Sequence, residues 1–284
     1  MFMQHCYPRI SKDSLLPVAT EGFSPDTKHL WYPPGHGDIY ASLFRSGLLE
    51  NLINQGKEYI FISNIDNLSA TVDMKVLYHL MNHDTEFCME VVPKTRADTV
   101  GGTLVEYKGQ VSGQNIDIQN DTVSLLFFSP FSDIISLSFF FSQQTKNTKQ
   151  KKTRLLEVGE VPKKHRQSFL STNSNFNLFN TNNLWVNLRA IQRLCASGAM
   201  NGDVIVKQTS VDDPNSTNHV RTMLHLQTAA GAAVKFFTSA VGLQVPRSRF
   251  RPVKTTSDLL AVQSTLYSIK HGALVMNPMR SINR

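Results

Sequence analysis

One stretch of the chain, EYIFISNIDNLSATVDMKVLYHLM, runs from Glu58 to Met81 and contains a strand, a turn and a helix. Its start, Glu58 to Ser63, is a short apolar run of the kind typical of a buried strand. Apolar residues then recur at helical spacing from Val72 to Met81. One helix face would carry Val72, Val76, Leu77, Leu80 and Met81. A strand joined by a polar turn to an amphipathic helix is the repeating unit of an α/β fold.

The same alternation continues along the chain. Phe87 to Val92 is predicted to be a second buried strand. Helices are expected from Leu184 to Cys195, from Thr228 to Phe237, and from Asp258 to about Ile269, the last one capped by Ser257. The pattern predicts an α/β domain with a mixed sheet flanked by helices.

Composition narrows the function classes. The chain has 284 residues, 41% of them hydrophobic, and a formal net charge of +7 with a pI near 9.3. A basic protein favours an acidic partner, but no nucleic-acid motif accompanies the scattered Lys and Arg. A polyanionic small substrate explains the charge equally well. Three widely spaced cysteines, Cys6, Cys88 and Cys195, indicate neither a disulfide framework nor a zinc site. With no signal peptide at the N-terminus, we expect a cytoplasmic protein.

The stretch from Val111 to Thr153 departs from the pattern. Its middle consists almost entirely of Leu, Phe, Ser and Ile, and its end is basic. As a membrane span it is poor, because Pro130, Asp133 and several serines interrupt it. We interpret the stretch as an insertion, largely unpacked and disordered, that arose as a translated intron. The alternative is a genuine surface insertion. The catalytic domain would then occupy residues 1–110 and 154–284.

Two motifs carry candidate chemistry. Asp66 follows the first strand, where acids face the ligand crevice of open α/β sheets, and its carboxylate suits Mg²⁺. Asn64, two residues earlier, can donate to a sugar or phosphate oxygen. Lys254 precedes ThrThrSerAsp, so it should lie at a helix N-terminus that already favours anions. The alternatives are an Asx turn at Asn64 and Asp66, and an exposed lysine ahead of a capped helix.

Two more motifs are weaker on their own. Gly35 and His36 follow two prolines in WYPPGHGDIY, in a loop whose backbone could approach a ligand closely. Asn183 in FNTNNLW is an amide suited to sugar hydroxyls, although the motif could be a plain strand-to-helix turn. Arg247, Arg249 and Arg251 alternate and would share one face of an extended segment, either as a secondary basic face or as a merely solvated one.

Taken together, these motifs and their order resemble the eukaryotic UTP–glucose-1-phosphate uridylyltransferases, from YPRI at Tyr7 to the helix after Lys254. The resemblance implies a nucleotide-diphospho-sugar transferase fold, Rossmann-like, incomplete at both ends. It implies that UTP and glucose 1-phosphate are converted to UDP-glucose and pyrophosphate with Mg²⁺ held by Asp66. One departure is Gln227, where the family usually carries Glu.

The resemblance also assigns roles to individual residues. Lys254 would be catalytic, and the nucleotide would contact Gln4, Gly35, Asp66 and Lys254. The sugar phosphate would contact His36, Asn64, Ile65, Asp66 and Asn183.

Three readings of the chain remain open. The family's glycine-rich nucleotide loop would lie upstream of Gln4, so we expect this chain to be a fragment with at most trace activity, and a homo-oligomer only in a longer form. The alternatives are an inactive product of the same family and a regulatory module that binds sugar nucleotides. A nucleic-acid-binding protein is disfavoured, because aromatic and basic residues do not interleave.

Overall fold

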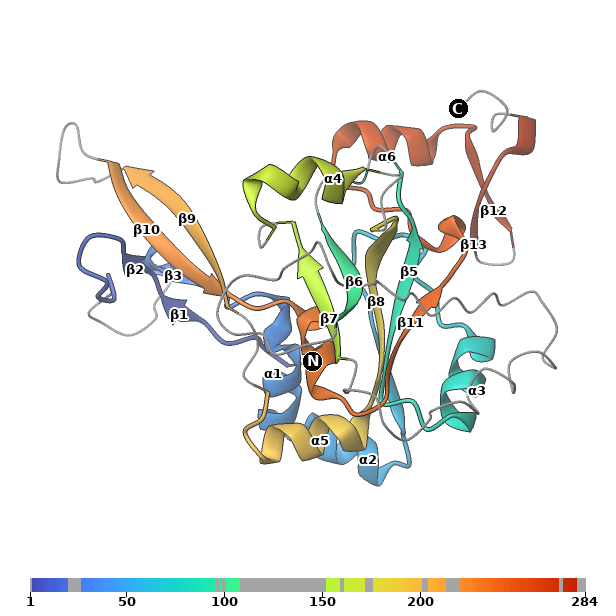
Figure 1. Cartoon of the computed structure of the whole chain (residues 1–284), viewed down its shortest axis with the longest axis horizontal. Helices are drawn as coiled ribbons and strands as arrows, with labels where there is room; N and C mark the ends of the chain where they lie inside the picture. The colour runs from blue at the N-terminus through green and yellow to red at the C-terminus, as the bar shows by residue number, and fades with distance from the viewer. Residues whose placement is uncertain are drawn as a thin grey trace. The chain divides into compact units, whose positions relative to one another are not determined.

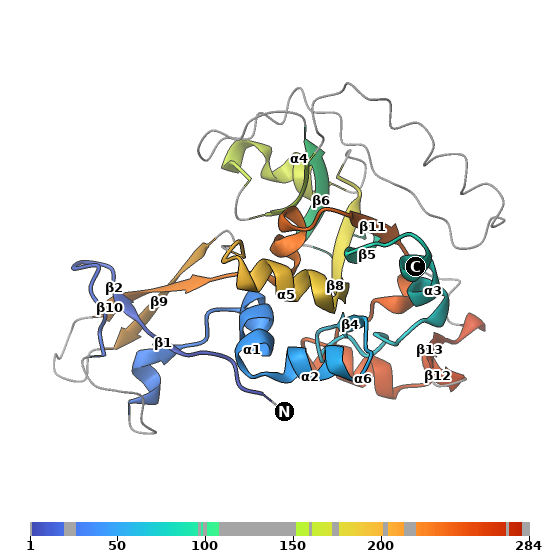
Figure 2. The same ribbon diagram turned by 90° about the horizontal axis from the view of Figure 1, so that it is seen from below.

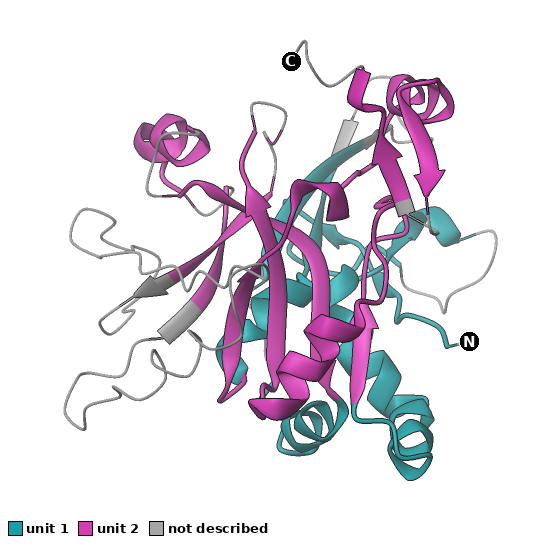
Figure 3. Ribbon diagram, turned by 90° about the vertical axis from the view of Figure 1, so that its right-hand side faces the viewer, with its two compact units in different colours: residues 1–58, 188–236 teal, residues 59–187, 237–284 magenta. Residues whose placement is uncertain are grey.

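The structure is a computed structural model, and it describes residues 2–19, 27–95, 98, 101–107, 152–158, 161–171, 176–200, 204–212, 220–270 and 273–279. These residues form two compact units (Figure 3). Unit 1 comprises residues 1–58 and 188–236, and unit 2 comprises residues 59–187 and 237–284. No helix in the described ranges is long and apolar enough to cross a membrane.

Unit 2 contains the predicted mixed sheet, in the strand order β11-β5-β8-β4. Figure 1 labels β11, β5 and β8, and Figure 2 labels β4. Its strands are β4 (Tyr59–Ile62), β5 (Phe87–Pro93), β8 (Leu178–Asn187) and β11 (Ala240–Gln244). β11 runs parallel to β5, whereas β8 runs antiparallel to both β5 and β4. Strands β4, β5 and β11 therefore point the same way, and their carboxyl ends lie at one edge of the sheet. This arrangement confirms the predicted fold class.

The helix α3 (Met74–Asn82) packs on this sheet. Val76 and Leu80 are buried in a core cluster with Cys88 and Trp185, as the helical spacing predicts. Val72 and Met81 are exposed, however, so the predicted face was too wide. Val72 lies before the helix, because α3 begins two residues later than expected, where Asp73 accepts a hydrogen bond from the Lys75 backbone N–H and caps the helix.

The remaining elements of unit 2 are short. β6 (Gly102–Tyr107) pairs with β7 (Lys152–Glu157), and β12 (Tyr267–Lys270) pairs with β13 (Ala273–Met276). Helical segments are η5 (Lys163–His165), α4 (Arg166–Leu170), η7 (Arg247–Arg249) and α6 (Thr256–Gln263).

The β6–β7 pair frames the predicted insertion. Tyr107 lies opposite Lys152, so the chain that leaves β6 returns directly beside it. Lys152 and Thr153, which the prediction placed in the insertion, belong to β7. Residues 108–151, which make up most of the predicted insertion, lie outside the described residues.

Unit 1 contains helices α1 (Ile39–Arg45), α2 (Leu48–Asn54) and α5 (Leu188–Ala196), which pack on one another (Figure 2). Its core includes Leu43, Leu49, Leu188 and Ile191. A three-stranded sheet has the order β2-β10-β9, with bounds Ile10–Ser11, Val220–Gln227 and Ile205–Asp212. The strands β1 (Tyr7–Pro8) and β3 (Trp31–Tyr32) form a separate pair, and short 3-10 turns are η1 (Lys28–Leu30), η2 (His36–Asp38) and η6 (Ala230–Phe236).

Three predicted helices need correction. Leu184 to Asn187 is the end of strand β8, and α5 begins only at Leu188, because the apolar run LeuTrpVal satisfies a strand between β5 and β4. The segment after Thr228 is the 3-10 helix η6. The last helix, α6, is capped by Thr255 rather than Ser257 and ends at Gln263, after which Tyr267 starts a strand.

Candidate functional site

Polar residues of unit 2 gather at the sheet edge where β4, β5 and β11 end. A β-bulge shapes this edge, because three residues of β8, Thr181 to Asn183, lie opposite the single residue Glu90 of β5. Asn182 takes the left-handed conformation there, with φ of 59°. Bulges of this kind re-aim side chains beside functional sites. The chain leaving β4 carries Asn64 and Asp66 to the same edge.

Two predicted segments meet at this edge. We call residues 63–71 the Asp66 loop and residues 245–254 the Lys254 segment. The Val253 N–H donates to the Asp66 carbonyl at 2.9 Å, and the Leu68 N–H donates to the Arg251 carbonyl at 3.3 Å. Asn67 and Pro252 form a β-bridge between the two segments. Asp66 and Lys254 lie nearly two hundred residues apart in sequence. Asp66 accepts this backbone hydrogen bond, and Lys254 directly follows its donor, Val253.

A buried hydrogen-bond network lies under both segments. We call Asn67, Glu90, Asn183, Trp185 and Arg249 the Glu90 network. The Glu90 side chain is fully buried and accepts from Trp185 Nε1 at 2.9 Å and from Asn183 Nδ2 at 3.1 Å. Arg249 donates to both Glu90 oxygens, from Nε at 2.8 Å and from Nη2 at 2.6 Å. Asn67 Nδ2 donates to Asn183 Oδ1 and to the Arg249 carbonyl.

The two predicted charged groups are themselves unengaged. In the described part of the chain, neither the Asp66 carboxylate nor the Lys254 ammonium has a hydrogen bond or ion pair. The Lys254 and Thr255 backbone N–H groups, by contrast, both donate to the Asp258 carboxylate, at 3.0 and 2.9 Å. These two N–H groups are therefore not available to an anion, because the Asp258 carboxylate accepts from both and forms the capping box of α6 with Thr255.

The predicted sugar contacts differ in exposure. Asn64 is exposed and its Oδ1 accepts from Asn182 Nδ2 at 2.7 Å, and Ile65 is 99% exposed. Asn183 is fully buried, and both ends of its amide are engaged, by Asn67 and by Glu90. The structure therefore brings Asn64, Asp66 and Asn183 to one edge, but gives Asn183 internal partners.

The three arginines near Lys254 do not form a common face. The segment turns into η7, and Arg247 makes a bidentate pair with Asp98 at 2.7 and 2.8 Å. Arg249 belongs to the Glu90 network. Arg251 donates to the Tyr267 hydroxyl at 2.7 Å and lies over its ring. The expectation of a shared basic face was wrong, because each guanidinium has its own partner.

Unit 1 brings together the other predicted residues, Gln4, Gly35 and His36. Gln4 Nε2 donates to the Gly35 carbonyl. Gly35 has φ of +88°, and a Cβ there would lie 2.5 Å from the Thr228 carbonyl oxygen. Only glycine avoids both the strained backbone and this overlap. A Cβ on Gly35 would also lie 3.2 Å from the Cβ of Gln227, so Gln227 borders this loop.

The tautomer of His36 follows from its contacts. The Ala230 N–H donates to His36 Nδ1 at 3.0 Å, so a neutral ring carries its proton on Nε2. Burial first, and the positive charge of Lys207 second, lower the pKa of His36 from its usual 6.5. His36 is therefore neutral near pH 7, and its Nε2–H, which has no acceptor among the described residues, can donate to a phosphate or hydroxyl oxygen.

We expect His36 to make the chain less stable in acid. Its pKa is lower in the folded state, so the two states bind protons equally above pH 6.5 and the unfolded state binds more below it. Because His36 is exposed, solvent screening keeps this loss small. Urea unfolding of the native chain and of His36→Asn, whose Oδ1 can still accept from Ala230, measures the difference. Equal losses in both proteins would contradict this assignment.

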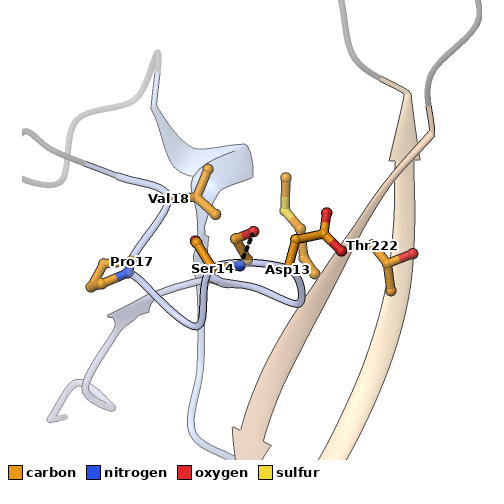
Figure 4. Close-up of a pocket in the computed structure, with 7 residues that line it drawn as sticks. Asp13, Ser14, Pro17, Val18 and Thr222 are labelled. Carbon is orange, nitrogen blue, oxygen red and sulfur yellow. Dashed lines mark hydrogen bonds between the residues drawn. The ribbon is translucent and has the colours of Figure 1, made fainter.

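A separate pocket of about 370 Å³ also lies in unit 1 (Figure 4). It lies beside β2 and β10 and is lined by Ser11, Asp13, Ser14, Pro17, Val18, Thr222 and Met223. Its lining contains a carboxylate and no Lys or Arg, and includes none of the predicted site residues. The pocket therefore suits a nucleotide poorly.

Several residues of these sites were missed from the sequence. Asp38 accepts from the His5 backbone N–H at 2.9 Å and from Ser42 Oγ at 2.7 Å, which ties the segment carrying Gln4 to the start of α1. Glu90 carried the clearest unused signal, since a carboxylate inside the apolar run FCMEVV must have partners. Nothing in the local sequence of Asn67 or Thr228 indicates their contacts.

The side chains at the sheet edge suit a Mg²⁺ ion that is bound only in part by the protein. The described residues contain no group of three or more His, Cys, Asp or Glu side chains that could hold a metal. Asp66 offers a single unengaged carboxylate at the sheet edge. Mg²⁺ in phosphoryl-transfer sites is held by one or two carboxylates, with substrate phosphates and water completing its shell. The residues present therefore fit a cation that arrives with a phosphate ligand.

Known proteins share this chain's sequence and fold. The family model described as UTP–glucose-1-phosphate uridylyltransferase matches residues 1–124 and 145–284, so the unmatched stretch lies within the predicted insertion. Relatives of that name from Astragalus penduliflorus and Saccharomyces cerevisiae are each 43% identical, over 99% and 98% of this chain. A solved UDP-glucose pyrophosphorylase from Leishmania major, a mutant in complex with UDP-glucose, is 34% identical over 97% of this chain, with a TM-score of 0.76.

The match covers only part of each relative. The aligned region is 48% of the Astragalus protein, 46% of the yeast protein and 51% of the Leishmania chain, so this chain spans about half their length. Within that half, the family model and the relatives cover nearly every residue, including both segments at the sheet edge and the Gly35 loop. The chain belongs to the UTP–glucose-1-phosphate uridylyltransferase family.

Proposed function

We propose that this chain supplies residues for the synthesis of UDP-glucose and pyrophosphate from UTP and glucose 1-phosphate. The observation that carries the proposal is the joining of Asp66 and Lys254 at the carboxyl edge of the sheet, through the Val253 N–H and the Asp66 carbonyl. Ligands of open α/β sheets bind outside this edge. Neither charged side chain has a partner among the described residues, which leaves Lys254 available to a phosphate and Asp66 to a phosphate-bound cation.

The reaction needs little covalent help from the protein. Glucose 1-phosphate is a phosphate monoester with a second pKa of about 6, so near pH 7 it is largely a dianion and already a nucleophile. One of its oxygens forms a bond to the α-phosphorus of UTP, and the bond to the β-phosphate breaks and releases pyrophosphate. The protein must align the two substrates and neutralise charge on the phosphoryl oxygens.

The residues of the chain divide these tasks. The Lys254 ammonium is placed to neutralise phosphoryl charge, and the Asp66 carboxylate would hold Mg²⁺, which when bound neutralises phosphate oxygens. Asn64 and Ile65 on the Asp66 loop would contact the sugar phosphate. Asn183 would act at the same edge. His36, with its donor Nε2–H, would bind the sugar phosphate, while Gln4 and Gly35 would contact the nucleotide.

Calorimetry with the purified chain tests the proposal. We expect UDP-glucose to bind in the presence of Mg²⁺ and to bind more weakly when EDTA is added. UDP-galactose and ADP-glucose are the matched comparisons for the sugar and for the base. If the chain, properly folded, bound none of the three at millimolar concentration, the proposed function would be wrong for it.

Turnover is measured in a chimera that joins this chain to the parts of the yeast relative lying outside the match. In this chimera we expect Asp66→Asn to raise the Mg²⁺ concentration for half-maximal rate. An amide oxygen has no charge and binds a hard cation more weakly, so the shift should be at least the roughly 10-fold that losing an outer-shell partner costs. Asp84→Asn, a change at an exposed acid after α3, is the control. An unchanged Mg²⁺ dependence would remove Asp66 as the metal ligand.

We also propose a cytoplasmic location. Cys6, Cys88 and Cys195 are all free thiols, as expected for a protein of a reducing compartment. Fractionation of cells expressing the tagged chain tests this.

A second reading is a sugar-nucleotide-binding module without turnover. This reading is supported by the match, which covers only about half of each relative. Binding of UDP-glucose by the chain, combined with an inactive chimera, would support this reading over the first.

A further inference from the structure

Glu90 is the only fully buried carboxylate among the residues whose side chains the structure describes. It lies inside β5 and in none of the sequence motifs. Removing a carboxylate from water is costly unless charged and hydrogen-bonding partners replace the lost hydration. The role of this carboxylate therefore depends on the groups that it contacts.

All of the accepting capacity of Glu90 is directed at four donors. Oε1 accepts from Trp185 and Arg249, and Oε2 accepts from Asn183 and Arg249. Trp185 and Asn183 belong to β8, next to β5 in the sheet. Arg249 comes from the Lys254 segment. The carboxylate thus fixes that segment to the rigid centre of the sheet by a bidentate, charge-assisted pair.

Arg249 in turn reaches the Asp66 loop. Its Nη2 donates to the Thr71 carbonyl at 2.9 Å, at the C-terminal end of the loop. Its own carbonyl accepts from Asn67 Nδ2 at 3.1 Å, in the middle of the loop. Asn67 Oδ1 completes the link by accepting from the Arg251 N–H at 2.8 Å. One arginine therefore contacts the sheet, the loop and, through its backbone, the segment that carries Lys254.

We infer that the Glu90–Arg249 pair is a positioning device that holds the Asp66 loop against the Lys254 segment, and thereby sets the spacing of the proposed metal ligand and the proposed phosphate-binding lysine. The role that we give to this spacing rests on the proposed function. The attachment of the Asp66 loop to the Lys254 segment follows from the described contacts alone. Both residues act through others, and neither is placed in contact with a substrate.

The neighbouring Arg247 offers a matched control. It lies two residues away in the same segment and also makes a bidentate pair with a carboxylate, Asp98. No contact of Arg247 reaches the Asp66 loop among the hydrogen bonds of the described residues. Arg249→Lys and Arg247→Lys each keep the positive charge and remove the planar fork that makes two parallel bonds.

Amide hydrogen exchange, measured by NMR on the 284-residue chain, tests directly whether the Asp66 loop stays attached to the Lys254 segment. The amides of Leu68, Arg251 and Val253 bridge the loop and the segment. In Arg249→Lys we expect these three to exchange at least 10-fold faster than in the native chain, while amides of β5 and β8 stay protected. In Arg247→Lys we expect all of them to exchange at native rates. Equal protection of the three amides in both variants would overturn the inference.

A double variant covers the case in which Arg249→Lys loses the whole fold. Glu90→Gln combined with Arg249→Met leaves no charge buried without its partner, and such replacements are often tolerated. We expect protected sheet amides together with fast exchange at Leu68, Arg251 and Val253. Native protection at these three amides would show that the pair does not hold the segments together.

The effect of the Glu90–Arg249 pair on the proposed metal site is tested by calorimetry, from the Mg²⁺ dependence of UDP-glucose binding. A variant that only loses folded protein lowers the number of binding sites and leaves the half-saturating Mg²⁺ concentration unchanged. We expect Arg249→Lys to raise that concentration at least 5-fold and Arg247→Lys to leave it within 2-fold. Fast exchange without this shift would make the pair purely structural and overturn the positioning role. Failure of the native chain to bind UDP-glucose would instead reject the proposed function. The hydrogen-exchange result would still show whether the pair attaches the loop to the segment.

Discussion

In the chimera with the yeast relative, Lys254→Ala is expected to lower kcat for UDP-glucose formation by roughly 100- to 1,000-fold, the loss seen when one preorganised donor to transition-state charge is removed. The KM for glucose 1-phosphate should rise much less. Among the described residues the Lys254 ammonium has no hydrogen bond or ion pair, so its charge is available to the phosphoryl oxygens. A cation aimed at charge that is redistributed in the transition state binds that state better than the ground state.

Steady-state kinetics in both substrates separates the two constants. Lys270→Ala removes an exposed lysine of β12 and is the control, with kcat expected to stay near that of the unmutated chimera. A Lys254→Ala protein in which only KM changes would make the lysine a ground-state binder. If both constants stayed intact, Lys254 would be no more than an exposed residue before a capped helix.

Glu90→Gln is expected to lower the free energy of unfolding by about 3–5 kcal/mol, the cost of leaving one partner of a buried ion pair uncompensated. Four donors converge on the carboxylate. An amide in its place points an NH₂ group at two of them and leaves the Arg249 charge without its counterion. At about 2–4 °C per kcal/mol for a chain of this size, the melting temperature should fall by roughly 10 °C.

Glu86→Gln is the control for this change. Glu86 lies just before the same strand, is more exposed, and its Oε2 accepts from the Thr238 N–H at 2.9 Å. Removing one charge at that surface should cost less than about 1 kcal/mol. Thermal and urea unfolding of the native chain and both variants measure the two effects. A Glu90→Gln protein as stable as Glu86→Gln would show that the pair contributes little net stability.

Local pattern was sufficient for two strands of the sheet and for the fold class. The apolar runs at Glu58–Ser63 and Phe87–Val92 became β4 and β5, because an apolar run of this length between polar turns is short for a buried helix and typical of a buried strand. The mixed sheet was correctly predicted. The helix boundaries were predicted less accurately, because capping residues determine where each helix begins. Asp73 and Thr255 cap α3 and α6, and their hydrogen bonds depend on one rotamer each rather than on periodicity.

The segment from Leu184 to Asn187 shows where pattern fails. Its residues suit a helix or a strand equally well, and the choice was made by β5 and β4, which offer hydrogen-bonding partners on both sides. Those strands come from distant parts of the chain. Tertiary contacts of this kind override local propensity.

The sequence by itself determined the α/β class, the family, and the motifs that contain Asp66, Lys254, Gly35 and His36. Only the tertiary structure decided which of these lie together. It joined Asp66 to Lys254 at one sheet edge, engaged Asn183 internally, and placed Glu90 and Arg249 beneath both segments. The physical reason is that a motif is a property of neighbouring residues, whereas the partners of a buried carboxylate are chosen by strand order and by the bulge opposite Glu90.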